Sequence, residues 1–155
     1  MTVEILPFLI FFTIFVSNYE ADRSTAIKDS GVISEWSEIF TQHNDEAVAG
    51  NVVNPGYTVY VNNSTIRRDG DVVKMWSLVD FTHPKKITNK SYMSVRSQDE
   101  YDCKGRQSRS LHYSFFAGNM GSEEVAVKSA QPTDWYPIEP DVLVKILFNA
   151  ACKKK

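Results

Sequence analysis

The side chains that could do chemistry in this chain are three histidines and the hydroxyl groups near one of them. His43, His83 and His112 lie far apart in the sequence, and none has a second ligand at a spacing typical of metal sites. Ser110 and Ser114 flank His112, but the chain has neither a nucleophile elbow nor an oxyanion-hole glycine pattern. The sequence therefore predicts no catalytic residue, no metal and no cofactor, and we expect a protein that is not an enzyme.

A basic segment is the stronger candidate for function. Seven Lys and Arg residues and three acidic residues fall between positions 85 and 109, whereas residues 1–80 carry five basic and eleven acidic residues. Such a segment can attract acidic parts of a partner protein, glycans or anionic lipid head groups. It can equally be a solvated sheet edge whose Lys and Arg prevent aggregation. The candidate partner-binding residues are Lys85, Lys86, Lys104, Arg106 and Arg109. The net charge of -2 argues against a nucleic-acid partner.

Two further groups of side chains have a functional and a structural interpretation. Asp99, Glu100 and Asp102 could offer paired carboxylates, but their closeness in sequence to basic residues favours surface ion pairs. The three tryptophans could form a surface on which a ligand stacks. Their large apolar area instead favours packing in the core. These tryptophans are Trp36, Trp76 and Trp135.

The N-terminal stretch predicts export. Residues 5–16 are almost entirely apolar, which is too short for a membrane-spanning helix and suits the apolar part of a signal peptide. We expect residues 1–21 to be the signal peptide, 22–30 a flexible leader and 31–155 a single domain, with no membrane span after processing. An uncleaved N-terminal anchor is the alternative. The expected location is the periplasm, the cell surface or the medium.

The elements that must position these side chains are mainly strands. The residue patterns predict strands over 31–40, 57–61, 72–81, 91–97, 106–117 and 123–128. Arg68-Asp69-Gly70-Asp71 predicts a hairpin turn, and the strand after it is apolar on both faces, as in a central strand. On the strand over 106–117, alternation groups Arg109 with Leu111, Tyr113 and Phe115. The segment 41–56 predicts a loop with at most a short helical turn, and Thr82–Lys90 predicts a basic connection.

The last element predicted is a C-terminal helix. Pro140 and Asp141 suit its start, and Val144, Phe148 and Cys152 recur every four residues on one face. In a small exported domain, the two cysteines favour one disulfide, although two separate buried thiols remain an alternative.

This order of signals resembles the surface-adhesin protein E family of exported bacterial proteins, over roughly residues 33–152. The residues that carry the resemblance are Trp36, Tyr60-Val61, Ser64-Thr65-Ile66, Met75–Phe81, Glu100-Tyr101-Asp102-Cys103, Arg106, Arg109, Gly118-Asn119-Met120-Gly121, Trp135–Pro140, Leu147 and Cys152. Asn62 stands where the family often has an acidic residue.

The resemblance implies an α+β fold, with an antiparallel sheet of about six strands and a C-terminal helix tied to one face by a Cys103–Cys152 disulfide. It also implies a binding protein that engages an extracellular-matrix or envelope protein, because the founding adhesin is associated with matrix proteins such as vitronectin and laminin. The alternative is a periplasmic structural or stress-related protein without adhesin activity. A homodimer stays open.

Overall fold

The computed structural model describes residues 35–43 and 45–153. The expectations for a signal peptide over 1–21 and a leader over 22–30 fall outside these described residues. From Glu35 onward the chain forms one compact unit.

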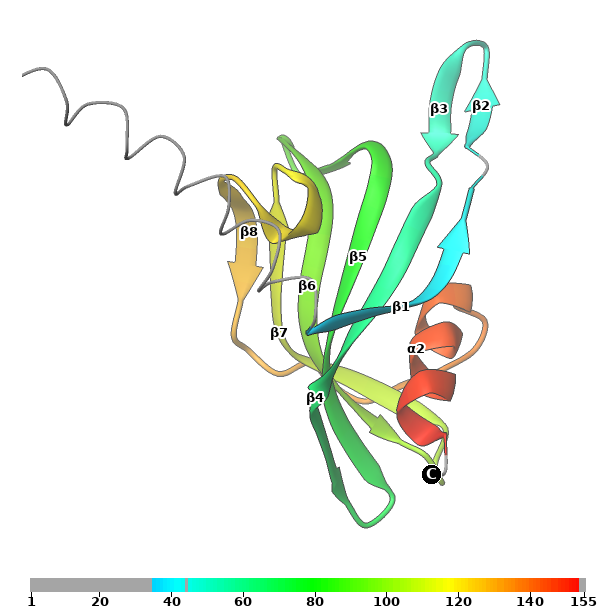
Figure 1. Ribbon diagram of the computed structural model, residues 1–155, viewed down its shortest axis with the longest axis vertical. Helices are drawn as coiled ribbons and strands as arrows, with labels where there is room; N and C mark the ends of the chain where they lie inside the picture. Colours follow the sequence, from blue (N-terminus) through cyan, green and yellow to red (C-terminus); the bar gives the residue numbers. More distant parts are fainter. Residues whose placement is uncertain (1–34, 44, 154–155) are drawn as a thin grey trace, which may run out of the picture. The chain divides into compact units, whose positions relative to one another are not determined.

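One antiparallel sheet and one helix make up most of this unit (Figure 1). The sheet runs in the order β1-β4-β5-β6-β7-β8, and short β9 pairs with the beginning of β7. The main strands are β1 (Trp36–Gln42), β4 (Tyr57–Asp69), β5 (Val72–Ile87), β6 (Lys90–Asp102), β7 (Gln107–Phe116), β8 (Val125–Ser129) and β9 (Tyr136–Pro137). The helix, α2, spans Val142–Cys152. This confirms the α+β class, the antiparallel sheet and the C-terminal helix, with seven strands where about six were predicted.

The β4–β5 hairpin forms where the turn residues predict it. Asp69 pairs with Val72, so Gly70 and Asp71 make a two-residue turn, and Gly70 has a φ of 58°. β5 lies between β4 and β6, as expected for a strand that is apolar on both faces. Both strands are longer than predicted, because bulges between Asn62 and Arg67 and between Asp80 and Lys85 let pairing continue beyond each irregularity. The expected connection over Thr82–Lys90 is therefore mostly strand.

A second correction concerns the segment 41–56. It holds a separate two-stranded hairpin, β2 (Glu46–Val48) with β3 (Asn51–Asn54), rather than a loop. Ala49 and Gly50 make its turn, both with positive φ. The loop-forming residues of this segment were correctly recognised, but the short strands between them carry too few residues to show an alternating pattern.

A third correction concerns β7. Gln98 faces His112 and Asp99 faces Ser110, so Leu111 is an extra residue in this strand. The bulge reverses the alternation, because every side chain before it moves to the opposite face. Arg109 therefore lies on the face opposite to Tyr113 and Phe115, whereas simple alternation had grouped the three together.

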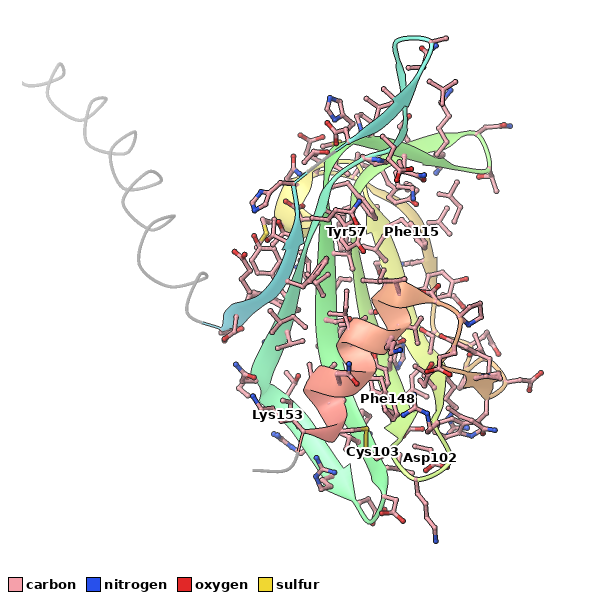
Figure 2. The ribbon with its side chains drawn as sticks, turned by 90° about the vertical axis from the view of Figure 1, so that its right-hand side faces the viewer. Tyr57, Asp102, Cys103, Phe115, Phe148 and Lys153 are labelled. Atoms are coloured by element: carbon pink, nitrogen blue, oxygen red, sulfur yellow. A yellow bond between two sulfur atoms is a disulfide. The ribbon has the colours of Figure 1, made fainter. Side chains whose placement is uncertain are left out.

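The helix packs against one face of the sheet, as Figure 2 shows. Asp141 caps its start by accepting a hydrogen bond from the Val144 backbone N–H at 3.0 Å. Leu147, Phe148 and Ala151 are its buried residues and pack on Val59, Val73, Met75 and Tyr101 of the sheet. At its end, the Arg68 guanidinium donates to the Ala151 carbonyl oxygen at 3.0 Å, where a helix presents unpaired carbonyl groups.

The Cys103–Cys152 disulfide joins the last residue of α2 to the turn that follows β6 (Figure 2). It confirms the cross-link between helix and sheet that the resemblance implied. Beyond the N-terminal end of the helix, a second apolar cluster of Val79, Phe81 and Tyr92 continues the core along the same face.

Candidate functional site: the sheet face opposite the helix

The basic residues predicted to bind a partner fall at two places on the sheet. Lys85 and Lys86 lie near the end of β5, where they pair with the beginning of β6. Lys104 and Arg106 lie in the turn after the other end of β6, and Arg109 lies in β7. β6 is 13 residues long, so the two groups stand roughly 40 Å apart along it. The structure does not bring the five side chains into a single patch.

The turn between β6 and β7 is held mainly by local contacts. The Asp102 carboxylate accepts hydrogen bonds from the backbone N–H groups of Lys104 and Gly105 at 3.0 and 2.8 Å. The Arg106 guanidinium lies 3.0 Å from the Glu139 carboxylate and 5.3 Å from the centre of the Phe148 ring. Both Lys104 and Arg106 are exposed, but Arg106 already has a carboxylate and an aromatic partner within the chain.

Arg109 belongs to the sheet face opposite α2, which we call the open face. Its guanidinium lies 2.7 Å from the Glu100 carboxylate and 4.8 Å from the centre of the Trp135 ring. The three acidic residues expected to form surface ion pairs therefore have three different roles. Glu100 does pair with an arginine, Asp102 closes a turn, and Asp99 is buried on the helix side.

One row of side chains crosses the open face from strand to strand. Cross-strand pairing places Trp36, Asn62, Trp76, Gln98 and His112 in line on β1, β4, β5, β6 and β7. The Trp76 and His112 rings are stacked, with centres 6.2 Å apart and planes 21° apart. The row therefore presents aromatic side chains on a surface that α2 does not cover. The short 3-10 helix η1 (Asn119–Gly121) lies against this face near Arg96.

A second row lies next to the first and is centred on Arg96. This β6 arginine pairs with Leu78 of the neighbouring strand β5, and Leu78 is fully buried. The guanidinium carbon lies 5.7 Å from the centre of the Trp36 ring and 5.3 Å from that of Phe116. Cation–π contacts of this kind are worth about 0.5–2 kcal/mol. They hold the guanidinium group of Arg96 near both rings on the open face.

The tryptophans are thus not core residues, contrary to the expectation from their size. The buried apolar clusters of the described chain contain no tryptophan, and all three are only partly buried. Trp36 and Trp135 each contact an arginine, and Trp76 contacts a histidine. The sequence of β5 contains the signal for this placement. Trp76 has the same parity as Lys74 and Asp80, whereas Val73, Met75 and Val79 have the other parity and are buried. Arg96 was the residue that sequence reasoning missed here.

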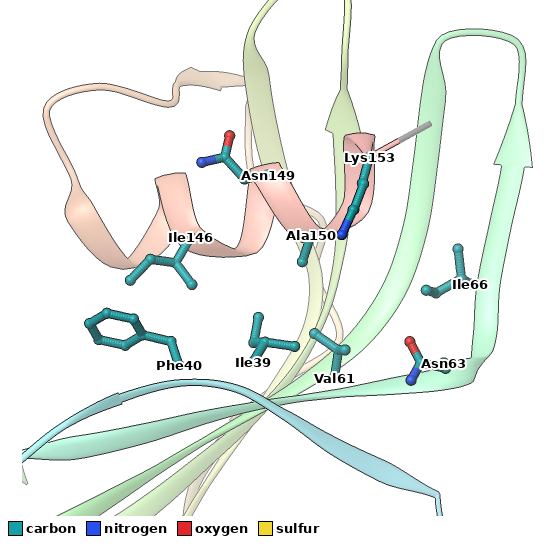
Figure 3. A pocket seen from close by; sticks show the side chains of 9 residues that line it. All are labelled: Ile39, Phe40, Val61, Asn63, Ile66, Ile146, Asn149, Ala150 and Lys153. Atoms are coloured by element: carbon teal, nitrogen blue, oxygen red, sulfur yellow. The ribbon is translucent and has the colours of Figure 1, made fainter. Parts of the chain in front are cut away.

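A groove of about 570 Å³ lies on the helix side, between α2 and strands β1 and β4 (Figure 3). Its walls are apolar and its rim is polar; the lining residues are Ile39, Phe40, Val61, Asn63, Ile66, Ile146, Asn149, Ala150 and Lys153. Exposed apolar side chains are few elsewhere on these strands, and Ile39 is 36% exposed. The groove is a second place where a partner could bury apolar surface.

The histidines do not gather into a metal site. His83 lies 3.2 Å from the Asp45 carboxylate. The pKa of Asp45 is lowered mainly by hydrogen bonds from the Thr82 hydroxyl and the Gly56 backbone N–H, and less by His83. Within residues 35–43 and 45–153, no three His, Cys, Asp or Glu side chains are placed to hold an ion together. In the same part of the chain, no helix is long and apolar enough to cross a membrane.

Comparison with solved structures finds structures of protein E at low sequence identity. Crystal form II of Haemophilus influenzae protein E is 15% identical, with 74% of this chain and 91% of that chain covered and a TM-score of 0.48. Protein E from non-typeable Haemophilus influenzae is 16% identical, with 75% and 84% covered and a TM-score of 0.45. No curated protein matches the sequence.

The family comparison is the informative one. The model of the family described as surface-adhesin protein E matches residues 46–153, which is more than half of the chain and extends from β2 to the end of α2. The matched region contains both cysteines of the disulfide and most of the open face. The chain belongs to the surface-adhesin protein E family.

Proposed function

We propose that this chain is an exported binding module that engages an extracellular protein through the open face of its sheet. The observation that carries the proposal is the open face itself, which gathers side chains from β1, β5, β6 and β7: Trp36, Trp76, Arg96 and His112. Membership of a family of surface adhesins supports a binding role and an exported location.

The composition of the face suits protein recognition. Tryptophan, tyrosine and arginine are enriched among the residues that contribute most to protein–protein affinity. Tyr60 lies beside Leu78 in the same row as Arg96, so all three types are present within one small area. Because Arg96 is already held between two rings, it loses little conformational freedom when a partner binds.

The predicted basic residues take a supporting part in this proposal. Arg109 lies on the open face beside Trp135 and can extend the contact surface. Lys85, Lys86, Lys104 and Arg106 lie at the ends of the sheet, where exposed cations increase the rate of encounter with an acidic partner more than the affinity. Their role in binding is proposed on this basis.

The test compares two surfaces of the same protein. Purified residues 22–155 and two variants are titrated against immobilised vitronectin and laminin. One variant, Trp76→Ala with Arg96→Ala, removes the centre of the open face; the other, Ile146→Ser, changes the groove on the helix side. Loss of central aromatic and arginine contacts costs about 1–4 kcal/mol. We therefore expect the first variant to bind at least about fivefold more weakly, and the second to bind as the unchanged protein does.

Two results would count against the proposal. Equal affinity of the open-face variant and the unchanged protein would exclude this face, and loss of binding in the groove variant alone would move the site to the helix side. Fractionation of cells addresses the alternative role in the envelope. A protein that external protease cannot reach, with no saturable binding to either matrix protein, would support a periplasmic structural role instead.

A further inference from the structure

A cleft of about 420 Å³ lies between α2 and the sheet, on the face opposite to the proposed protein-binding surface. It follows β6 from Tyr92 to Tyr101. The part near Tyr92 has apolar walls, formed by Phe81, Val95, Phe115 and Leu143. Its volume is within the range of sites that hold small molecules.

The other end of the cleft is polar and buried. Asp99 is 8% exposed, and its carboxylate accepts a hydrogen bond from the Ser97 hydroxyl at 2.6 Å. The Ser77 hydroxyl lies 3.1 Å from that of Ser97, which extends the network into the sheet. Burial raises the pKa of the Asp99 carboxyl, and the hydroxyl groups of Ser97, Ser110 and Tyr101 oppose this only in part.

Among the described residues at this end, Asp99 has hydrogen-bond donors but no cationic partner, and Ser108 has no hydrogen-bond partner. Within the described part of the chain, no Lys, Arg or His nitrogen lies within ion-pair distance of Asp99. Ser108 is 1% exposed and lines the same cleft, and its hydroxyl has no hydrogen-bond partner among the described residues. The Ser108 hydroxyl lowers the pKa of the nearby Tyr136 phenol in part, but no hydrogen bond of normal geometry joins their oxygen atoms.

Unsatisfied buried polar groups cost about 1–3 kcal/mol each and are uncommon in folded proteins. A carboxylate and a hydroxyl that face the same cleft are complementary to a donor group with a positive charge. The Lys85 ammonium group, 5.1 Å from the centre of the Phe81 ring, lies at the apolar end and would repel a second positive charge there.

We propose that this cleft binds a small monoamine, with its ammonium group against Asp99 and Ser108 and its apolar body between Phe81, Val95 and Leu143. The ammonium group is the positively charged partner that the Asp99 carboxylate lacks, and it donates a hydrogen bond to the Ser108 hydroxyl oxygen. Hydrogen bonds to charged groups contribute about 1.5–3 kcal/mol, so a cationic ligand gains more here than a neutral ligand of the same shape.

The experiment uses three probes with the same ring and different charge: 2-phenylethylamine, 2-phenylethanol and 3-phenylpropanoate. Binding to residues 22–155 is followed by shifts of methyl NMR signals from Val95, Leu143 and Leu147. We expect the amine to bind at least about tenfold more tightly than the alcohol, and the carboxylate most weakly.

Asp99→Asn should remove the preference for the amine over the alcohol while it leaves binding of the alcohol unchanged. Leu143→Trp, at the partly exposed wall, should weaken all three probes together, and it provides a test that leaves the buried carboxyl in place. The proposal is overturned if the amine gives no saturable shift at about 10 mM, if alcohol and amine bind alike, or if Asp99→Asn keeps the preference. These results are independent of the open face, since the cleft lies on the other side of the sheet.

Discussion

Asp99 shows how much the environment of a single residue depends on the face to which its strand turns it. Its neighbour Glu100 pairs with Arg109 on the open face, whereas Asp99 points to the helix side and is buried there. Burial raises its pKa above that of an ordinary aspartate, and Tyr101 and Tyr136 are the titratable groups around it.

This pKa shift predicts how stability depends on pH. Because the carboxyl titrates at higher pH in the folded protein than in the unfolded chain, the folded state binds the proton more tightly. The stabilising contribution is present below the unfolded pKa, near pH 4, and is lost as the pH rises through the folded pKa. We expect the stability of the unchanged protein, relative to Asp99→Asn, to fall as the pH rises from about 4 toward neutral.

Urea unfolding of both proteins at a series of pH values measures this difference, and the other carboxyl groups cancel in the comparison. Ser97→Ala is the matched second variant, because it removes the short hydrogen bond to the carboxylate and should raise the Asp99 pKa further. A difference in stability that is constant with pH, or that increases toward neutral pH, would contradict the prediction.

Residue positions were predictable from the sequence wherever a strand alternates without interruption. The first part of β5, up to Asp80, is such a case, since its alternation separates Trp76 from Val73 and Met75. The size of tryptophan suggested a core position instead. β7 is the opposite case. The extra residue Leu111 changes the face of everything before it, and single-residue bulges leave no signature in composition. Ser108 lies on the helix side because of that bulge, whereas Asp99 lies there through the ordinary alternation of β6.

The two hairpin turns allow a test at the level of elements. Gly70 and Gly50 both have positive φ, and a Cβ at either position would meet no other atom. Replacement by alanine therefore changes only the backbone preference, which costs about 1–2 kcal/mol in the left-handed region. The Gly70 turn joins β4 and β5 of the main sheet, whereas the Gly50 turn closes the exposed β2–β3 hairpin.

We expect Gly70→Ala to lower the free energy of unfolding by about 1–2 kcal/mol, and Gly50→Ala to change it by less than about 0.5 kcal/mol. The reason is that the β2–β3 hairpin can open without loss of the main sheet. Urea unfolding followed by circular dichroism gives both values. Equal losses at the two turns would show that the small hairpin unfolds together with the sheet.

The helix and its cross-link give a second test at this level. The Cys103–Cys152 disulfide closes a loop with a sequence separation of 49, which contributes about 4 kcal/mol in the chain-entropy account. The double variant Cys103→Ser with Cys152→Ser should lose stability of that order, and its unfolding midpoint should not respond to reducing agent. Identical midpoints of the unchanged protein with and without reductant would refute this contribution.

The helix was predictable from its four-residue repeat, because a single stripe of Val144, Phe148 and Cys152 needs only local spacing. The β2–β3 hairpin was not predictable, because strands of three and four residues are too short to show a clear two-residue alternation. The same limit applies to the bulges of β4 and β5, where pairing resumes after residues that look like a loop.

At the scale of the whole molecule, the sheet separates two surfaces of different chemistry. The open face gathers aromatic rings and arginines, and the helix side contains the apolar clusters, the groove and the cleft. The sequence predicted the class of fold and the family, which depend on the order of elements. It did not predict which basic residues lie together, because Lys85 and Arg106 are close in sequence but at opposite ends of β6.

The disulfide also decides how the protein would respond to mechanical force. β7, β8, β9 and α2 all lie inside the covalent loop that Cys103 and Cys152 close. When tension is applied between Trp36 and Lys153, this loop cannot lengthen. The fully extended chain is therefore roughly 170 Å shorter than it would be without the disulfide. The load passes instead through residues 36–103, which hold β1 to β6, and crosses to the end of α2 at the sulfur atoms. A partner bound on the open face would thus be held by the strands that resist the pull.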